Sequence, residues 1–312
     1  MGKSIKFILL RLLPSALICM FCSLPASTRA EPITPSYMYL PIITHIYSAT
    51  RQQTIIVDHT TTNLSQIPDF WIQQARLLTL HYAHTSHGGQ ITIGLEWLEN
   101  QNAKYDVAIH IEDGSGPALP PASGALRIYD GNPGDSYVTP EWYWSTEAGR
   151  NLTRSVANTG WFNFSMWSFC GQMSNYDVTE VQTYLDVMNQ FEQEYPAMRF
   201  IYMTGHTDGT FGDPASILKR NNNLVRAYVT TNKKILFDFA DIETYDPGGT
   251  YHADASDACP WCGAWCSSHP ADCANLGEIS DCSHSHPLMC KLRAHAFWWM
   301  MARLAGWPGP VQ

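Results

Sequence analysis

Residues 77–89, Leu-Leu-Thr-Leu-His-Tyr-Ala-His-Thr-Ser-His-Gly-Gly, contain the transition that decides the fold. The largely apolar residues at 77–82 predict a buried β-strand, and the polar and glycine residues at 83–89 predict the loop that ends it. Apolar residues then recur through 91–98 and predict a helix. A strand followed by a loop and a helix is the repeating unit of a parallel sheet covered by helices.

The same alternation continues to the C-terminus. We therefore expect an α/β three-layer sandwich of the flavodoxin-like kind, in which helices cover both faces of a mainly parallel sheet. Ligands bind at the carboxyl ends of such strands, so the loops at 83–89, 170–175 and 205–209 are candidate site loops. The other expected strands are 161–169, 200–204 and 235–239, and the other expected helices are 67–76, 178–195, 216–231 and 287–305.

Residues 101–150 interrupt the alternation, because they are rich in Gly and Pro and contain the aromatic cluster Trp142-Tyr143-Trp144. We interpret them as an insertion that runs over the edge of the sheet. The faces of tryptophan and tyrosine rings suit sugar rings, which favours a carbohydrate ligand. A decorated surface loop is the alternative interpretation.

The first thirty residues have the pattern of a secretory signal peptide. Lys3, Lys6 and Arg11 precede an apolar run at 12–24, and small residues precede a cleavage position after Ala30. The run is too short for a membrane span, so we expect a secreted or periplasmic protein with no membrane contact after cleavage. Residues 31–312 then form a single domain. The net charge of −9 argues against a nucleic-acid partner.

Six cysteines are concentrated near the C-terminus, between residues 259 and 290. In an exported chain, an even cluster of this kind predicts a disulfide-rich segment, and its pairing cannot be deduced from the sequence. A zinc site is the alternative, since Cys259-Pro-Trp-Cys262 has ligand spacing and His269 is near. Cys170 stands far upstream, and we interpret it as a small buried apolar residue. The six are Cys259, Cys262, Cys266, Cys273, Cys282 and Cys290.

The strand-end loops contain the parts of an acyl-transfer site. Ser86 follows a strand and precedes a glycine-flanked helix start, so its hydroxyl is a candidate nucleophile. Asp281 and His284 are three residues apart before the last helix, where the carboxylate could orient the imidazole as a base. Candidate oxyanion donors are Gly171, His206 and Thr207, each of which follows a strand.

In this order the residues resemble the SGNH (GDSL-type) hydrolase superfamily. That family places a serine after the first strand, a glycine after the second, a Gly-x-Asn-Asp loop after the third and Asp-x-x-His before the last helix. Ser86, Gly171, the loop at 205–208 and the segment 281–284 follow that order over residues 77–305. The chain departs from the family in having His84-Thr85 before the serine and Thr207 at the asparagine position. The resemblance implies a secreted serine hydrolase that needs no metal or cofactor.

The expected substrate is a small-molecule ester, for example an acyl or acetyl ester of a carbohydrate. Two other functions stay open: a non-catalytic binding protein on the same fold, and a zinc-binding protein that uses the His and Cys clusters. His286 is an alternative base, since His286-Pro287 matches a His-Pro pair in the family. We expect His81 to be a hydrogen-bonded core residue and Asn221-Asn222-Asn223 to face solvent. Asp238 and Asp241 are alternative orienting acids, although helix capping is the simpler role.

Overall fold

One sheet of parallel strands forms the centre of the computed structural model, which describes residues 53–210, 212–213 and 215–310. The strand order is β1-β7-β6-β5-β2-β4-β3, and every pair in it is parallel. The predicted signal peptide at 1–30 lies outside the described residues. The strands are β1 (Ile55–Val57), β2 (Thr79–His84), β3 (Val107–Ile111), β4 (Leu126–Asp130), β5 (Phe164–Ser168), β6 (Arg199–Met203) and β7 (Ile235–Phe237).

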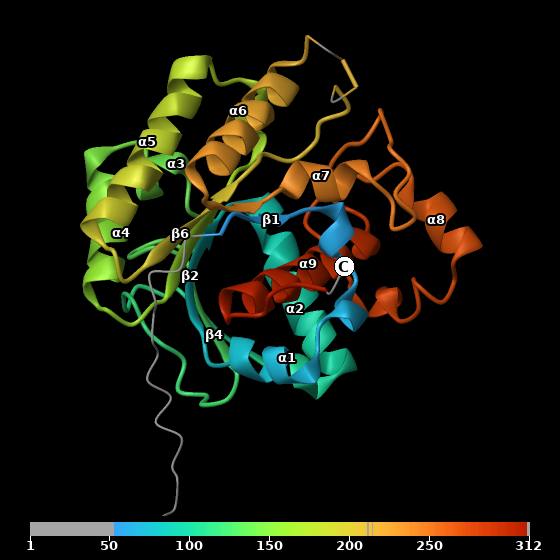
Figure 1. Ribbon diagram of the computed structural model, residues 1–312, viewed down its shortest axis with the longest axis horizontal. Helices are drawn as coiled ribbons and strands as arrows, with labels where there is room; N and C mark the ends of the chain where they lie inside the picture. The colour runs from blue at the N-terminus through green and yellow to red at the C-terminus, as the bar shows by residue number, and fades with distance from the viewer. Residues whose placement is uncertain (1–52, 211, 214, 311–312) are drawn as a thin grey trace, which may run out of the picture. The chain divides into compact units, whose positions relative to one another are not determined.

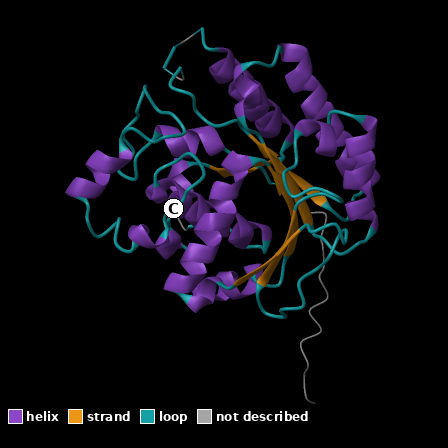
Figure 2. Ribbon diagram, turned by 180° about the vertical axis from the view of Figure 1, so that it is seen from behind, coloured by secondary structure: helices purple, strands orange, loops and turns teal. Residues whose placement is uncertain are grey.

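Helices cover both faces of this sheet, as predicted (Figures 1 and 2). One layer contains α1 (Asp69–Ala75), α2 (Gly89–Gln101) and α9 (Pro287–Leu304). The other contains α3 (Pro140–Tyr143), α4 (Glu147–Asn158), α5 (Val178–Glu194) and α6 (Ile217–Asn232), whereas α7 (Phe239–Thr244) and α8 (Cys262–Ser268) lie in the connection to α9. The 3₁₀ helices are η1 (His59–Thr61), η2 (Leu64–Gln66), η3 (Ser86–Gly88), η4 (Ala103–Tyr105), η5 (Gly171–Ser174) and η6 (Leu276–Glu278).

Local sequence explains why these elements begin and end where they do. All five residues of β5 are buried, which is typical of a parallel strand covered on both faces. Helix α5 begins with a capping box in which Asp177 and Glu180 satisfy each other's backbone N–H groups. Helix α9 ends before Gly306, which adopts a φ of +110° that few other residues tolerate. In the part of the chain that the structure describes, no helix is long and apolar enough to cross a membrane.

The segment 101–150 differs from the expected insertion. It does reach the edge of the sheet, but it builds that edge, because β3 and β4 both lie within it. Two of the three clustered aromatic residues, Tyr143 and Trp144, are buried in the core, whereas Trp142 is 44% exposed. The cluster is therefore mainly core packing, and it no longer favours a carbohydrate ligand at this place.

Buried polar side chains give one confirmation and one correction. His81 is fully buried between Ser165 Oγ (2.8 Å from Nδ1) and the Gly131 carbonyl (2.9 Å from Nε2), as predicted. Burial lowers its pKa to about 4, so the ring is neutral. The expectation that the asparagines of α6 face solvent is wrong for Asn221 and Asn222. Their amides bind backbone groups of the strand-end loops, which would otherwise be left unpaired.

The cysteine cluster forms three disulfides, which confirms that prediction. The pairs are Cys259–Cys262, Cys266–Cys273 and Cys282–Cys290. The sulfur atoms of Cys259-x-x-Cys262 are bonded to each other and cannot hold zinc in this state. The bonds cross-link the long, mostly irregular connection from α7 to α9.

Candidate active site at the carboxyl edge of the sheet

The strand order makes the position between β2 and β5 the topological switch point of the sheet. The chain passes from β2 to β3 and β4 on one side, and then returns to β5 on the other side of β2. Loops that leave two neighbouring strands in opposite directions open a crevice between them, which is the usual ligand site of a doubly wound sheet. Ser86 and His87 follow β2 at this point, and Cys170 and Gly171 follow β5.

A buried imidazole, His87, lies at this switch point. Its Nδ1 lies 3.1 Å from Cys170 Sγ, and its Nε2 lies 3.3 Å from Asp257 Oδ2. Its ring stacks on His206 at 3.8 Å between centroids and lies 5.0 Å from the ring of His284. Loops from β2, β5, β6 and the α7–α9 connection therefore converge on one residue that is only 6% exposed.

The surroundings of His87 keep its ring neutral. Burial and, to a smaller extent, the neighbouring His206 lower its pKa to about 4, although the carboxylate of Asp257 acts in the opposite direction. With Nε2–H donating to Asp257, Nδ1 is the acceptor that faces the Cys170 thiol. A neutral imidazole with one acceptor nitrogen aimed at a thiol can remove its proton.

The interpretation of Cys170 as a buried apolar residue is wrong. Its side chain is half-buried, it forms no disulfide, and its sulfur contacts His87. The backbone N–H of Cys170 donates to Gln172 Oε1 at 2.6 Å, which fixes the turn between β5 and η5. The sequence signal for a functional role was its position directly after a strand, because residues at the carboxyl ends of parallel strands often lie in the ligand site.

Ser86 lies at the same edge but is not yet linked to a base. Ser86 is the first residue of η3, and its side chain is half-buried. Its hydroxyl makes no hydrogen bond with His284, His286 or any other described residue. Gly88 allows the following turn to fold back on β2, since a Cβ there would lie 2.2 Å from His84 Cβ. The assignment of Ser86 as nucleophile stays a prediction.

Of the predicted acid Asp281 and the predicted bases His284 and His286, only His284 reaches the His87 centre. The Asp281 carboxylate accepts the Ser283 backbone N–H (2.9 Å), and no hydrogen bond joins it to His284 within the described residues. His284 is exposed with a φ of +75°, and its ring reaches the His87 centre. His286 caps α9, because its Nδ1 accepts the Leu288 backbone N–H at 3.1 Å. The structure thus brings His284 to the site, and it gives Asp281 and His286 local backbone roles.

The three predicted oxyanion residues differ in whether their donor groups are already used. Gly171 begins η5 next to Cys170 and is half-buried. His206 Nδ1–H donates to the Thr207 carbonyl at 2.6 Å, so its Nε2 is an acceptor in this arrangement. The backbone N–H of Thr207 donates to the buried carboxylate of Glu243 and is already used, and its Oγ1 is buried without a hydrogen-bond partner in the described part of the chain.

The alternative orienting acids have structural partners. Asp238 caps α7 and forms a bidentate ion pair with Arg226, and Asp241 accepts a hydrogen bond from His59. Asp257, which does contact the central imidazole, had no sequence signal because it lies in an irregular segment. His84 Nε2 lies 2.9 Å from Asp130; burial lowers the pKa of His84, but the Asp130 carboxylate outweighs this and raises it above the usual value.

A metal ion is a second possible occupant of this centre. Ligand atoms of His87, Cys170 and His206 lie within 4.8 Å of one another. The two imidazole planes are only 2° apart and stacked, however, and a ring nitrogen's lone pair lies in its ring plane. The lone pairs therefore run side by side instead of converging on one point, which does not fit a tetrahedral zinc site.

The fold and the site define a doubly wound α/β protein with an imidazole-centred cluster at its topological switch point. Comparisons with family models, with curated proteins and with solved structures find no match to this chain. The resemblance to SGNH hydrolases therefore stays an interpretation of residue order.

Proposed function

We propose that the protein is a hydrolase that cleaves an ester by acyl transfer to one of its own side chains. The observation that carries this proposal is the contact chain from Cys170 Sγ through His87 to Asp257, which matches a nucleophile, a base and an orienting acid. The three disulfides fit an oxidising compartment, so we propose a secreted or periplasmic location.

In the first step Cys170 Sγ forms a bond to the ester carbonyl carbon as His87 Nδ1 takes the thiol proton. The C–O bond then breaks, and His87 returns that proton to the leaving alcohol oxygen. A water molecule next attacks the thioester carbon and transfers a proton through His87 to the departing sulfur, which releases the acid. Asp257 holds the ring and stabilises the imidazolium, and the Gly171 backbone N–H is the nearest candidate oxyanion donor.

Ser86 is the competing nucleophile, with His284 as its base, as the family resemblance implies. Its half-exposed side chain at a helix start favours this arrangement. His87 does not serve it well, because adjacent residues of a 3₁₀ turn point about 120° apart. The function is the same ester hydrolysis in both cases, and only the nucleophile differs.

Chemical labelling distinguishes the two nucleophiles. We expect iodoacetamide to alkylate Cys170, as located by peptide mapping, and ester cleavage to fall in proportion. We expect Cys170→Ala to abolish cleavage of short-chain aryl esters and Ser86→Ala to keep most of it. Fluorophosphonate labelling that is lost only in Ser86→Ala, with active Cys170→Ala, would instead assign the serine. Folded protein that cleaves no ester in a broad panel would favour a binding protein.

The pH profile provides a separate prediction. The base must be unprotonated to act, so activity is present above the pKa of His87 and lost as the pH falls through it. We expect the acid limb of kcat/KM well below the usual imidazole value, because burial and His206 lower that pKa to about 4. His206→Phe keeps a stacked ring but removes the second imidazole from beside His87, and it should move the limb to higher pH. A wild-type limb near pH 6.5, unchanged in His206→Phe, would contradict His87 as the base.

A further inference from the structure

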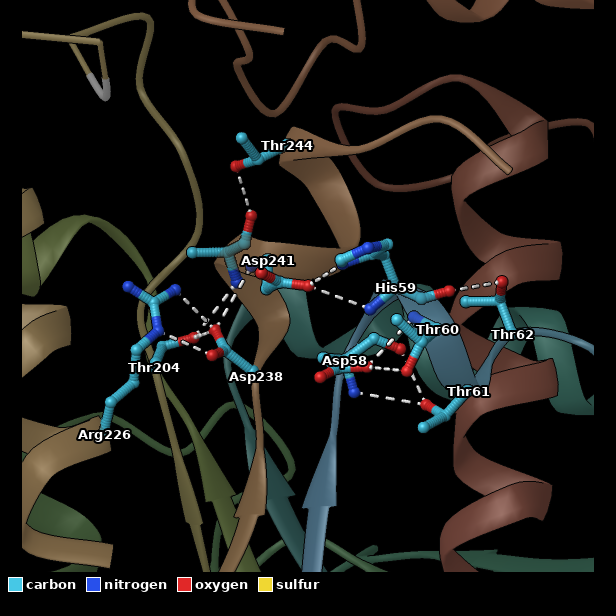
Figure 3. A network of polar contacts seen from close by, with 11 residues as sticks. Asp58, His59, Thr60, Thr61, Thr62, Thr204, Arg226, Asp238, Asp241 and Thr244 are labelled. Carbon is cyan, nitrogen blue, oxygen red and sulfur yellow. Dashed lines mark hydrogen bonds and ion pairs between the residues drawn. The ribbon is translucent and has the colours of Figure 1, made fainter. Parts of the chain in front are cut away.

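Three further polar side chains meet at the carboxyl ends of β1 and β7, away from the His87 centre (Figure 3). Asp58 and His59 directly follow β1, and Asp241 lies in the first turn of α7, the helix that comes after β7. These two strands are parallel neighbours whose ends are aligned, so the residues that follow them emerge at the same place. The strand order puts at least three strand spacings between this place and His87, which is on the order of 14 Å.

The three side chains have the composition of a metal site. One ligand atom from each lies within 4.8 Å of the other two, and the His87 centre is the only other such group in the part of the chain that the structure describes. His59 Nδ1 lies 2.5 Å from Asp241 Oδ1, which also accepts the His59 backbone N–H at 2.9 Å. Asp58 Oδ1 accepts the backbone N–H and the hydroxyl of Thr60 (2.9 and 2.6 Å). The Oδ2 atoms of both carboxylates accept no hydrogen bond from the described residues, so they are available as ligands.

The carboxylates at these strand ends outnumber their cationic partners. Arg226 forms a bidentate ion pair with Asp238, at 2.6 and 2.7 Å, which neutralises that carboxylate (Figure 3). Neither Asp58 nor Asp241 forms an ion pair with a lysine or arginine among the described residues. Counted with Lys219 nearby and with a neutral imidazole, three carboxylates face two cations, which leaves one surplus negative charge. The cluster therefore favours a cation over an anion.

The donor set selects the metal. An imidazole nitrogen and two carboxylate oxygens are usual ligands of Zn²⁺, and three protein ligands with one open position are typical of zinc sites that act on a substrate. Mg²⁺ and Ca²⁺ prefer oxygen ligands, so the imidazole disfavours them. Unlike the stacked rings of the His87 centre, the His59 ring directs Nδ1 at a carboxylate oxygen. A zinc ion would replace the proton between these two atoms, and their side chains, each 23% exposed, have room to separate around it.

A polar cavity of about 380 Å³ adjoins the cluster and gives a metal ion a way in. Asp241 belongs to its wall, and so does Tyr245, whose ring stacks on His59 at 4.0 Å between centroids. This stack holds the imidazole in one orientation, as a metal ligand requires. Water or a small ligand in the cavity can fill the open coordination position. The other lining residues are Lys219, Asn223, Arg226 and Tyr251.

We propose that Asp58, His59 and Asp241 bind a zinc ion at the ends of β1 and β7. The proposal is independent of the ester hydrolysis proposed at Cys170, because the two places are too far apart for one bound ion to contact both. The site also uses none of the cysteines, six of which are closed in disulfides.

Calorimetric titration of the chelator-treated protein with zinc chloride tests the site. We expect one zinc ion to bind and Mg²⁺ or Ca²⁺ not to compete with it. Asp58→Asn and Asp241→Asn should each weaken the affinity by about 100-fold or more, because loss of even an outer hydrogen-bond partner of a ligand costs about 10- to 100-fold. Asparagine Oδ1 still accepts the N–H groups of Thr60 and His59, so the local fold is kept. Zinc should raise the Tm of the wild type but not that of the double variant Asp58→Asn/Asp241→Asn.

His252→Gln is the matched control, because His252 Nε2 lies 3.1 Å from Asp246 Oδ2 in a pair with no third ligand among the described residues. It should leave the zinc affinity unchanged. Cys170→Ala tests the His87 centre as the competing site and should also bind zinc as the wild type does. The proposal is overturned if the wild type binds no zinc, if the double variant Asp58→Asn/Asp241→Asn binds it unchanged, or if Cys170→Ala loses it.

Discussion

Replacing His87 by glutamine is expected to lower kcat for ester hydrolysis by about 10³ to 10⁴. Glutamine fills similar space and still offers polar atoms to Cys170 and Asp257, but it cannot take up the thiol proton. The loss should appear in kcat more than in KM, because the proton moves only as the transition state forms. Stopped assays with an aryl ester, with folding checked by circular dichroism, measure it.

Double variants show whether Cys170, His87 and Asp257 act together in one step. If His87 serves Cys170, the double variant His87→Gln/Cys170→Ala should be no slower than the slower single variant, because each single change already removes the same step. Asp257→Asn should cost less than either, since the Asp257 side chain is about one third exposed (33%) and its charge is partly screened by water.

A second imidazole provides the control for this prediction. His284 lies against His87 but has no hydrogen bond to Cys170 among the described residues, so His284→Gln should change kcat only a few-fold. A large loss in His284→Gln, together with an active His87→Gln, would contradict the assignment. That result would return the role of base to His284 and the role of nucleophile to Ser86.

The sequence predicted which loops come together at the candidate site but not the contacts within it. Parallel strands end at one edge, so the loops at 83–89, 170–175 and 205–209 had to come together once their strands were recognised. Ser86 and His87 lie on the same 3₁₀ turn and point in different directions, so the register of that turn decides which of them faces Cys170. The sequence does not define this register. Asp257 could not be predicted, because it lies in an irregular segment with no periodic pattern.

The errors in the fold have a related cause. The strands β3 and β4 are five residues long, and the stretch between them is rich in Gly and Pro. Their hydrophobic pattern is too short to be recognised as a strand beside so many turn residues, so the segment was predicted to be an insertion. Asn221 and Asn222 look like a solvent face because polarity on a helix usually indicates exposure. In this fold their amides satisfy backbone groups of the neighbouring loops, and that demand is visible only in three dimensions.

Arg293 and Glu243 form the most deeply buried ion pair of the described residues. Their side chains are 0% and 1% exposed. The guanidinium also packs 3.8 Å from the centroid of Phe239, and the Glu243 carboxylate accepts the Thr207 backbone N–H. Burial raises the pKa of Glu243 and lowers that of Arg293, while each partner's charge opposes the shift of the other. The pair therefore joins α9 and α7 to the loop that carries His206.

Replacing Arg293 by methionine is expected to lower the free energy of unfolding by about 3 to 5 kcal/mol, because a carboxylate is left buried without a counter-charge. Urea unfolding measures the change. The double variant Arg293→Met/Glu243→Gln should recover part of the loss, since the neutral amide still accepts the Thr207 N–H. Lys104→Met is the exposed control: the Asp69 side chain of that pair is 74% exposed, so its loss should cost less than about 1 kcal/mol. If Arg293→Met is no more destabilising than Lys104→Met, the position of the His206 loop depends on contacts other than this pair.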